Sequence, residues 1–105
     1  MRIYHLAEVA RWEEARASGA YEQSTLGRTL AEEGFVHASR EDQWETVLET
    51  FYADHDGPLV LLEIDTELLS SPWQEDQVGD TTFPHVYGPI NPSAVVDTHP
   101  IPATG

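Results

Sequence analysis

The chain has 105 residues, of which 19 are acidic and five are basic, and its formal net charge is −14. It contains neither cysteine nor lysine, which excludes disulfides, thiol nucleophiles, thiolate metal sites, lysine Schiff bases and the phosphate-binding P-loop. Because nucleic acids and anionic membranes are bound mainly through Lys and Arg, this charge predicts affinity for neither, although the acidity can equally be a general solubility trait.

The first part of the chain predicts two strands separated by a helix. Residues 2–6 (RIYHL) have strand character, and residues 8–18 predict a helix with its apolar side chains near one face. Gly19 follows at a position that favours the end of a helix. Residues 20–33 predict irregular structure with one helical turn, and residues 35–38 predict the next strand.

A second helix is predicted to follow this strand. Ser39 has the side chain of a helix N-cap, and the helix is expected to extend to about Tyr52. Its predicted core face has the spacing i, i+3, i+4 and i+7, at Trp44, Val47, Leu48 and Phe51.

The remaining segments predict strands. Residues 58–65 (PLVLLEID) contain an apolar run without alternation, which predicts a central strand covered on both faces. Residues 73–78, 83–87 and 93–98 predict further strands, and residues 99–105 predict a flexible tail.

This order of elements predicts one α+β domain over residues 1–105, with two main helices packed on a strongly bent, mixed or antiparallel sheet. No apolar stretch is long enough to span a membrane, and the N-terminal segment lacks the uninterrupted apolar run of a signal peptide. We therefore expect a cytoplasmic protein without a membrane partner; the sequence leaves the oligomeric state open.

Three histidines stand among apolar or aromatic neighbours, in IYHLA, GFVHAS and FPHVYGP. Strand alternation places His5 on the face of Ile3, which we expect to be the less buried one. There His5 either lines a cleft or is a half-exposed histidine without a role. His37 shares a face with Phe35 and Ser39, where it is either a ligand-facing imidazole or a core histidine bonded to a backbone carbonyl. If His5 and His37 face a ligand cavity, they are expected to titrate near neutrality.

Two further candidates come from the later strands. His85 and Tyr87 lie where two prolines and a glycine fix the backbone, so this segment either displays them for binding or packs them structurally. Glu75 follows Trp73 in PWQED and either faces a ligand or lies beside a tryptophan that packs under the loop.

No metal site is expected, because the sequence has no HExxH motif and no closely spaced histidine and carboxylate ligands. Three distant histidines would have to converge in the fold to hold zinc. His55 and His99 are expected to be solvent-exposed.

Five motifs in order (IYHLA with RWEEA, EEGFVHAS, LVLLEID, a Trp-x-Glu and FPHVYGPI) resemble those of a family of small uncharacterised bacterial proteins known as domain of unknown function 952. The resemblance covers nearly the whole chain and implies no established reaction. The fold of that family is similar to the ADP-ribosyltransferases, especially their RNA 2′-phosphotransferase branch, in which YHL, VHAS and LLEID have counterparts in the same order.

The second resemblance implies a site for NAD. By it, His5 and His37 contact the ribose, nicotinamide or adenosine part, Ser39 shapes the nicotinamide pocket and Tyr21 stacks on the ligand. The sequence departs from the phosphotransferases in having few arginines, two of which (Arg11 and Arg16) lie on a predicted helix surface.

A late glutamate-x-glutamate pair, which protein-modifying transferases carry, is also missing, so His85 and Tyr87 would take over that region. Two functions then remain. The first is NAD-dependent ADP-ribosyl transfer or NAD hydrolysis, with His37, His85 and Glu75 as catalytic residues and Glu75 stabilising the developing cation. The second is a non-catalytic domain that binds a nucleotide-like or other small ligand.

Overall fold

The computed structural model describes residues 1–25, 28–52, 55 and 57–101. Its elements, in chain order, are β1 (Arg2–Glu8), α1 (Val9–Ser18), β2 (Gln23–Thr25), β3 (Arg28–Thr29), α2 (Leu30–Glu33), β4 (Val36–His37), α3 (Trp44–Phe51), β5 (Leu59–Asp65), the 3-10 turn η1 (Thr66–Leu68), β6 (Trp73–Val78), β7 (Thr81–Val86), the 3-10 turn η2 (Pro92–Ala94) and β8 (Val95–Ile101). In the described part of the chain the strands form three antiparallel sheets, β1-β5-β8, β2-β3 and β4-β7-β6. The predicted α+β class is confirmed; α2 adds a short helix that the sequence indicated only as a turn.

Strand β5 is central to the largest sheet, with β1 on one side and β8 on the other. Its side chains alternate between two apolar cores. Val60, Leu62 and Ile64 belong to the main core, whereas Leu59 and Leu61 belong to a second core that also contains Val47 of α3. The unbroken apolar run in the sequence therefore reflects burial on both faces, as predicted.

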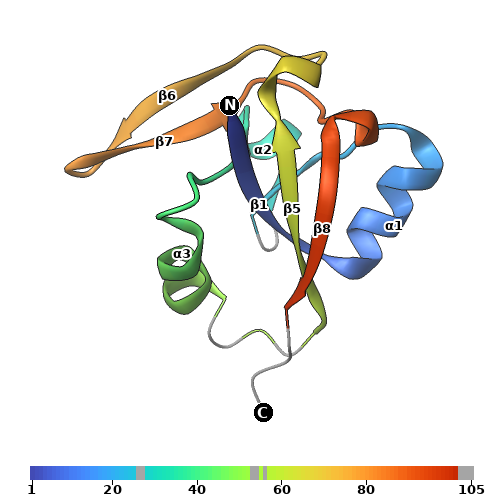
Figure 1. The fold of residues 1–105 in the computed structure, drawn as a ribbon, viewed down its shortest axis with the longest axis horizontal. Helices are drawn as coiled ribbons and strands as arrows, with labels where there is room; N and C mark the ends of the chain where they lie inside the picture. The colour runs from blue at the N-terminus through green and yellow to red at the C-terminus, as the bar shows by residue number, and fades with distance from the viewer. Residues whose placement is uncertain (26–27, 53–54, 56, 102–105) are drawn as a thin grey trace.

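The two longer helices lie on opposite sides of this sheet, α1 on the right and α3 on the left in Figure 1. Helix α1 buries Trp12 and Ala15 in the main core. It ends at Gly19, which has a φ of 88° and donates its N–H to the carbonyl of Ala15. An L-residue with a side chain rarely adopts this left-handed conformation, so glycine is the favoured residue for ending the helix there.

Helix α3 begins later than the sequence predicts, and Ser39 is not its cap. The backbone N–H and carbonyl of Ser39 are both paired with Tyr4 at 2.7 Å, which holds this residue in an isolated bridge to β1. A residue held in a strand-like bridge cannot also start a helix, so the chain makes a turn first. The side-chain oxygen of Gln43 accepts from the N–H of Arg40 in that turn, and α3 starts at Trp44.

The core face predicted for α3 is correct within the described side chains. Val47 is buried, and Trp44 and Leu48 pack against the same core. The side chain of Phe51 lies outside the described residues.

The predicted flexible tail is wrong at its start. Residues His99, Pro100 and Ile101 continue β8 and pair with Leu61, Val60 and Leu59 of β5. A proline is tolerated there because β8 is an edge strand, where a backbone N–H on the open side has no partner strand. Residues 102–105 lie outside the described part.

The hairpin of β6 and β7 projects from the main sheet at the upper left of Figure 1. Its partner β4 connects to β1 through the Tyr4–Ser39 bridge, so the two three-stranded sheets meet along β1 and β4. Among the described residues, no helix is long and apolar enough to cross a membrane.

Removal of a β5 core side chain tests this arrangement. Leu62 is 0% exposed in the main core, so we expect Leu62→Ala to lower the free energy of unfolding by about 2–5 kcal/mol. Leu68→Ala is the matched control, because that leucine is 49% exposed in η1 and its loss should cost little. Urea unfolding of both variants measures the difference, and equal effects would contradict the central position of β5.

Candidate functional site

Two groups of polar side chains meet at the junction of β1 and β4. The inner pair consists of His5 and Tyr21, which are 3% and 2% exposed. The Nδ1 atom of His5 lies 2.5 Å from the carbonyl oxygen of His37, and its Nε2 lies 2.9 Å from the hydroxyl of Tyr21. Since a carbonyl can only accept, His5 donates through Nδ1 and accepts the Tyr21 hydroxyl at Nε2.

The inner pair satisfies the free edge of β4. Strand β4 pairs with β7 on one side only, and on its other side the carbonyl of His37 is taken by His5. An unpaired buried carbonyl would destabilise this junction. The sequence suggested, as one alternative, that His37 is a core histidine bonded to a backbone carbonyl. In the structure His5 has this role, and the carbonyl is that of His37.

The outer cluster consists of His37, His85, Asp76 and Tyr87. His37 and His85 are direct cross-strand partners of β4 and β7, and Nδ1 of His37 lies 3.2 Å from Nε2 of His85. On its other side, Nδ1 of His85 donates to a carboxylate oxygen of Asp76 at 2.7 Å. The same oxygen accepts the hydroxyl of Tyr87. The cluster thus leads from a carboxylate through one imidazole to a second.

Aromatic rings cover the outer cluster. The ring of Phe35 stacks on that of His85, with centroids 3.9 Å apart and planes 15° apart. The ring of Phe83 lies 5.1 Å from that of His37. These rings restrict water around the imidazoles while His37 remains partly exposed.

Burial determines the electrostatics of both groups. It lowers the pKa of His5 to about 4, because the charged imidazole loses its hydration in the core. Burial, with a smaller effect of neighbouring His85, also lowers the pKa of His37 to about 4. Both imidazoles are thus neutral at pH 7. Titration near neutrality was expected if the two histidines faced a solvated cavity, but burial lowers both pKa values well below that range.

The pKa values of the two tyrosines are raised, whereas that of Asp76 is lowered. Burial raises the pKa of Tyr21, whereas the hydrogen bond with Asp76 is the main cause that raises the pKa of Tyr87. The hydroxyl of Tyr87 and the ring N–H of His85 lower the pKa of Asp76, since both stabilise the carboxylate. Asp76 is therefore ionised at neutral pH and fixes the donor side of His85.

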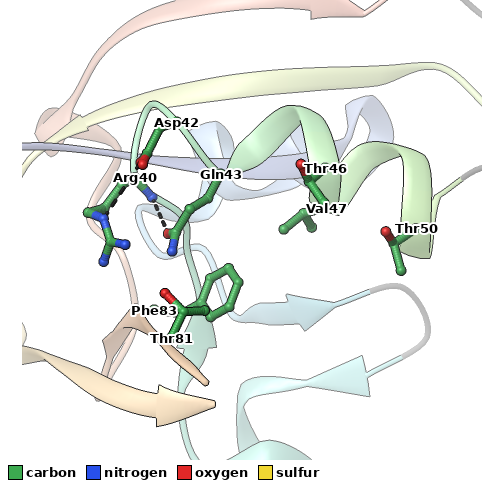
Figure 2. A pocket seen from close by; sticks show the side chains of 8 residues that line it. All are labelled: Arg40, Asp42, Gln43, Thr46, Val47, Thr50, Thr81 and Phe83. Carbon is green, nitrogen blue, oxygen red and sulfur yellow. Dashed lines mark hydrogen bonds and ion pairs between the residues drawn. The ribbon is translucent and has the colours of Figure 1, made fainter. Parts of the chain in front are cut away.

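An open groove of about 260 Å³ lies beside the outer cluster, between α3 and the edge of β7. Figure 2 shows the residues that line it: Arg40, Asp42, Gln43, Thr46, Val47, Thr50, Thr81 and Phe83. Phe83 borders both the groove and His37. His5, His37 and His85 are not among the lining residues of this groove.

The family model described as protein of unknown function DUF952 matches residues 6–98. The chain belongs to this family. No curated protein matches the chain. The DUF952 domain is similar to protein CC0527 from Caulobacter crescentus, whose crystal structure has a TM-score of 0.84 and 26% sequence identity over 100% of this chain and 90% of that one.

The solution NMR structure of CC0527 gives a TM-score of 0.71 and 29% identity, over 93% of this chain and 82% of that one. The family assignment made from the sequence motifs is thus confirmed. The expected similarity to the ADP-ribosyltransferase fold is not supported, since these solved structures are of CC0527 and the described strands form three separate antiparallel sheets.

The predicted site residues are only partly brought together in this DUF952 domain. His37, His85 and Tyr87 meet in the outer cluster. His5 and Tyr21 are buried on the other edge of β4, and the face of His5, expected to be the less buried one, belongs to the main core with Ile3. Tyr21 forms a hydrogen bond with His5, and the inner pair reaches His37 only through a carbonyl that cannot pass on a proton.

Ser39 and Glu75 lie apart from the outer cluster. Ser39 is buried and held by its backbone pairing with Tyr4. Glu75 forms an ion pair with Arg40 and accepts the hydroxyl of Thr82 at 3.3 Å.

Asp76 is not among the site residues predicted from the sequence, although strand alternation places it on the opposite face from Glu75. Side chains on a strand alternate between faces, and Gln74 of β6 is the cross-strand partner of His85. Asp76, two residues on, shares that face and reaches His85, whereas Glu75 points to the other face. The register of β6 against β7, which no single motif contains, makes this distinction.

The lowered histidine pKa values predict acid lability. In the unfolded chain both histidines bind protons below about pH 6.5, whereas in the folded chain they do so only near pH 4. The contribution of the two neutral histidines to the free energy of unfolding is therefore fully present above pH 6.5 and is lost as the pH falls from 6.5 towards 4. The slope of the unfolding free energy against pH approaches roughly two protons per molecule in this window. Asp76 contributes in the same direction only at lower pH.

Urea unfolding between pH 4.5 and 7.5 measures this slope. His37→Gln should reduce it by about one proton, because it removes one of the two imidazoles whose pKa is lowered by burial. Stability that does not change between pH 7 and pH 5 would show that the two imidazoles are not held neutral.

Loss of the inner hydrogen bond should be costly. Tyr21→Phe leaves Nε2 of His5 as a buried acceptor without its donor, which we expect to cost roughly 1–3 kcal/mol of unfolding free energy. Tyr87→Phe is the matched control, because that phenol is 39% exposed and Asp76 can turn to water. Urea unfolding compares the two variants, and a smaller loss for Tyr21→Phe than for Tyr87→Phe would contradict the role of the inner pair.

Proposed function

We propose that this DUF952 domain binds a small polar molecule at the outer cluster and that His37 exchanges a proton with it. One observation carries the proposal. Asp76 orients His85, and His85 in turn orients His37, so the Asp76 carboxylate determines which nitrogen of the partly exposed His37 imidazole carries the proton.

The protons of the cluster can be assigned from its acceptors. Asp76 is ionised, so His85 donates through Nδ1 and, when neutral, keeps Nε2 as an acceptor. His37 then donates through Nδ1, and its Nε2 carries the lone pair. Within the described residues, this Nε2 has no hydrogen-bond partner, so it is available to a ligand.

This arrangement suits a general base. A carboxylate that fixes the tautomer of an imidazole is the arrangement by which hydrolases prepare a histidine for proton transfer. The lowered pKa of His37 keeps the acceptor form fully populated at neutral pH, although it also makes the imidazole a weaker base. Such a base is suited to a substrate group that becomes more acidic as the reaction proceeds.

The position of Glu75 distinguishes this proposal from ADP-ribosyl transfer. Stabilisation of an oxocarbenium-like centre would need a carboxylate near the ligand, but Glu75 is neutralised by Arg40 on the other face of β6. Asp76 is already engaged by His85 and Tyr87. NAD-dependent transfer or hydrolysis therefore receives less support than proton transfer, and NAD enters as one candidate ligand among several.

Chemical modification tests the proposal without a known substrate. Diethyl pyrocarbonate acylates an accessible, unprotonated imidazole nitrogen, so at pH 7 His37 should react faster than His5, which is only 3% exposed. Asp76→Asn should slow the reaction at His37 by about tenfold, the scale on which removal of an orienting carboxylate changes a site. Peptide mass spectrometry measures the rate at each histidine.

Glu75→Gln is the matched control, because it removes the adjacent carboxylate of the same strand without touching His85. It should leave the rate at His37 unchanged. An inert His37, or equal effects of the two substitutions, would refute the proposal. NAD, ADP-ribose and nicotinamide can then be added in turn: protection of His37 by one of them identifies it as a ligand, and turnover separates catalysis from binding alone.

A further inference from the structure

A second group of potential ligand atoms lies on the sheet β1-β5-β8, apart from the outer cluster and the groove. It consists of Glu63 of β5 with Asp97 and His99 of β8. Asp97 and His99 are two residues apart, so they point to the same face of the strand. Glu63 is the direct cross-strand partner of Asp97, which brings all three side chains together.

The backbone is irregular at this point. Pairing of β5 with β8 shifts between Glu63 and Ile64, because β8 places two residues, Val96 and Asp97, where regular pairing would place one. A bulge of this kind increases the local twist and re-aims the neighbouring side chains. It occurs directly beside the Glu63–Asp97 pair.

The ligand atoms already have the spacing of a metal site. Nε2 of His99 lies 3.1 Å from one carboxylate oxygen of Glu63 and 3.8 Å from one of Asp97. All three atoms lie within 4.8 Å of one another. Ligands at the usual bond lengths of tetrahedral zinc are separated by about 3.4 Å, so small side-chain rotations would complete the site.

The charge of the group favours a cation, with one internal competitor. Arg2 forms an ion pair with the second carboxylate oxygen of Glu63 at 2.8 Å, which leaves the first oxygen directed at His99. Two carboxylates and one guanidinium leave one negative charge beside the imidazole, in a chain whose net charge is −14. The imidazole nitrogen favours first-row transition ions over Mg²⁺ and Ca²⁺, which prefer oxygen ligands throughout.

We propose that Glu63, Asp97 and His99 bind a divalent transition-metal ion, for which Zn²⁺ is the appropriate probe. Three protein ligands leave a fourth position for water or an external ligand. Because the ion joins β5 to β8, it also fastens the edge strand, including the His99–Ile101 segment, to the centre of the sheet.

Calorimetric titration of the chelator-treated full chain with Zn²⁺ at pH 7 tests the proposal. We expect one ion per chain and a tenfold or greater loss of affinity in both His99→Gln and Asp97→Asn. Arg2→Gln should increase the affinity several-fold, because it removes the cation that competes for Glu63. Mg²⁺ should not displace Zn²⁺ at equal concentration.

Two controls assign the binding to this group. Glu67→Gln removes an equal charge from an exposed position near the same end of β5 and should leave the affinity unchanged. In histidine NMR spectra, Zn²⁺ should shift the ring signals of His99 and leave those of His37 unchanged. Absence of one-to-one binding, retained affinity in His99→Gln, or a shift at His37 in place of His99 would overturn the proposal.

Discussion

The hydrogen bond from His5 to the carbonyl of His37 is the contact on which the site depends. The two three-stranded sheets do not share a strand, and a backbone bridge joins Tyr4 of β1 to Ser39, which follows β4. The Tyr4–Ser39 bridge supplies the backbone part of this junction, and His5 supplies the side-chain part, with Tyr21 satisfying its second nitrogen. A single imidazole thus pairs with the His37 carbonyl on the side of β4 that faces away from β7, and in doing so it fixes the backbone from which the His37 side chain projects.

This use of histidine has an electrostatic consequence. A neutral imidazole can be buried only if both nitrogens find partners, and the inner pair meets that condition, whereas protonation would place an uncompensated charge in the core. The outer cluster differs from the inner pair because it contains a charged group, the ionised and partly exposed carboxylate of Asp76. The inner pair therefore holds the junction together, whereas the outer cluster leaves Nε2 of His37 without a hydrogen-bond partner among the described residues.

The strong negative charge is distributed in a way that separates the two proposed sites. Arg40 is engaged by Glu75 and Asp42 beside the groove, and Arg2 is engaged by Glu63 at the far sheet. Carboxylates on both sheets therefore have internal cations, and exposed ion pairs of this kind add little to stability. Their effect is on ligand choice, because they decide which carboxylate oxygens remain available to an incoming proton donor or cation.

The sequence by itself determined the elements whose signals are local. The apolar run of β5, the glycine that ends α1 and the helical spacing at Val47 each act through neighbours in the chain, and each was confirmed. The five motifs likewise determined the family. Only the tertiary structure decided how these elements meet. The register of β6 against β7 selected Asp76 over Glu75 as the partner of His85, the bridge to Tyr4 took Ser39 away from the helix, and pairing with β5 ordered His99 in a segment that reads as a tail. The physical reason is that each of these outcomes is a contact between residues far apart in sequence, whose free energy exists only once the strands have been brought together.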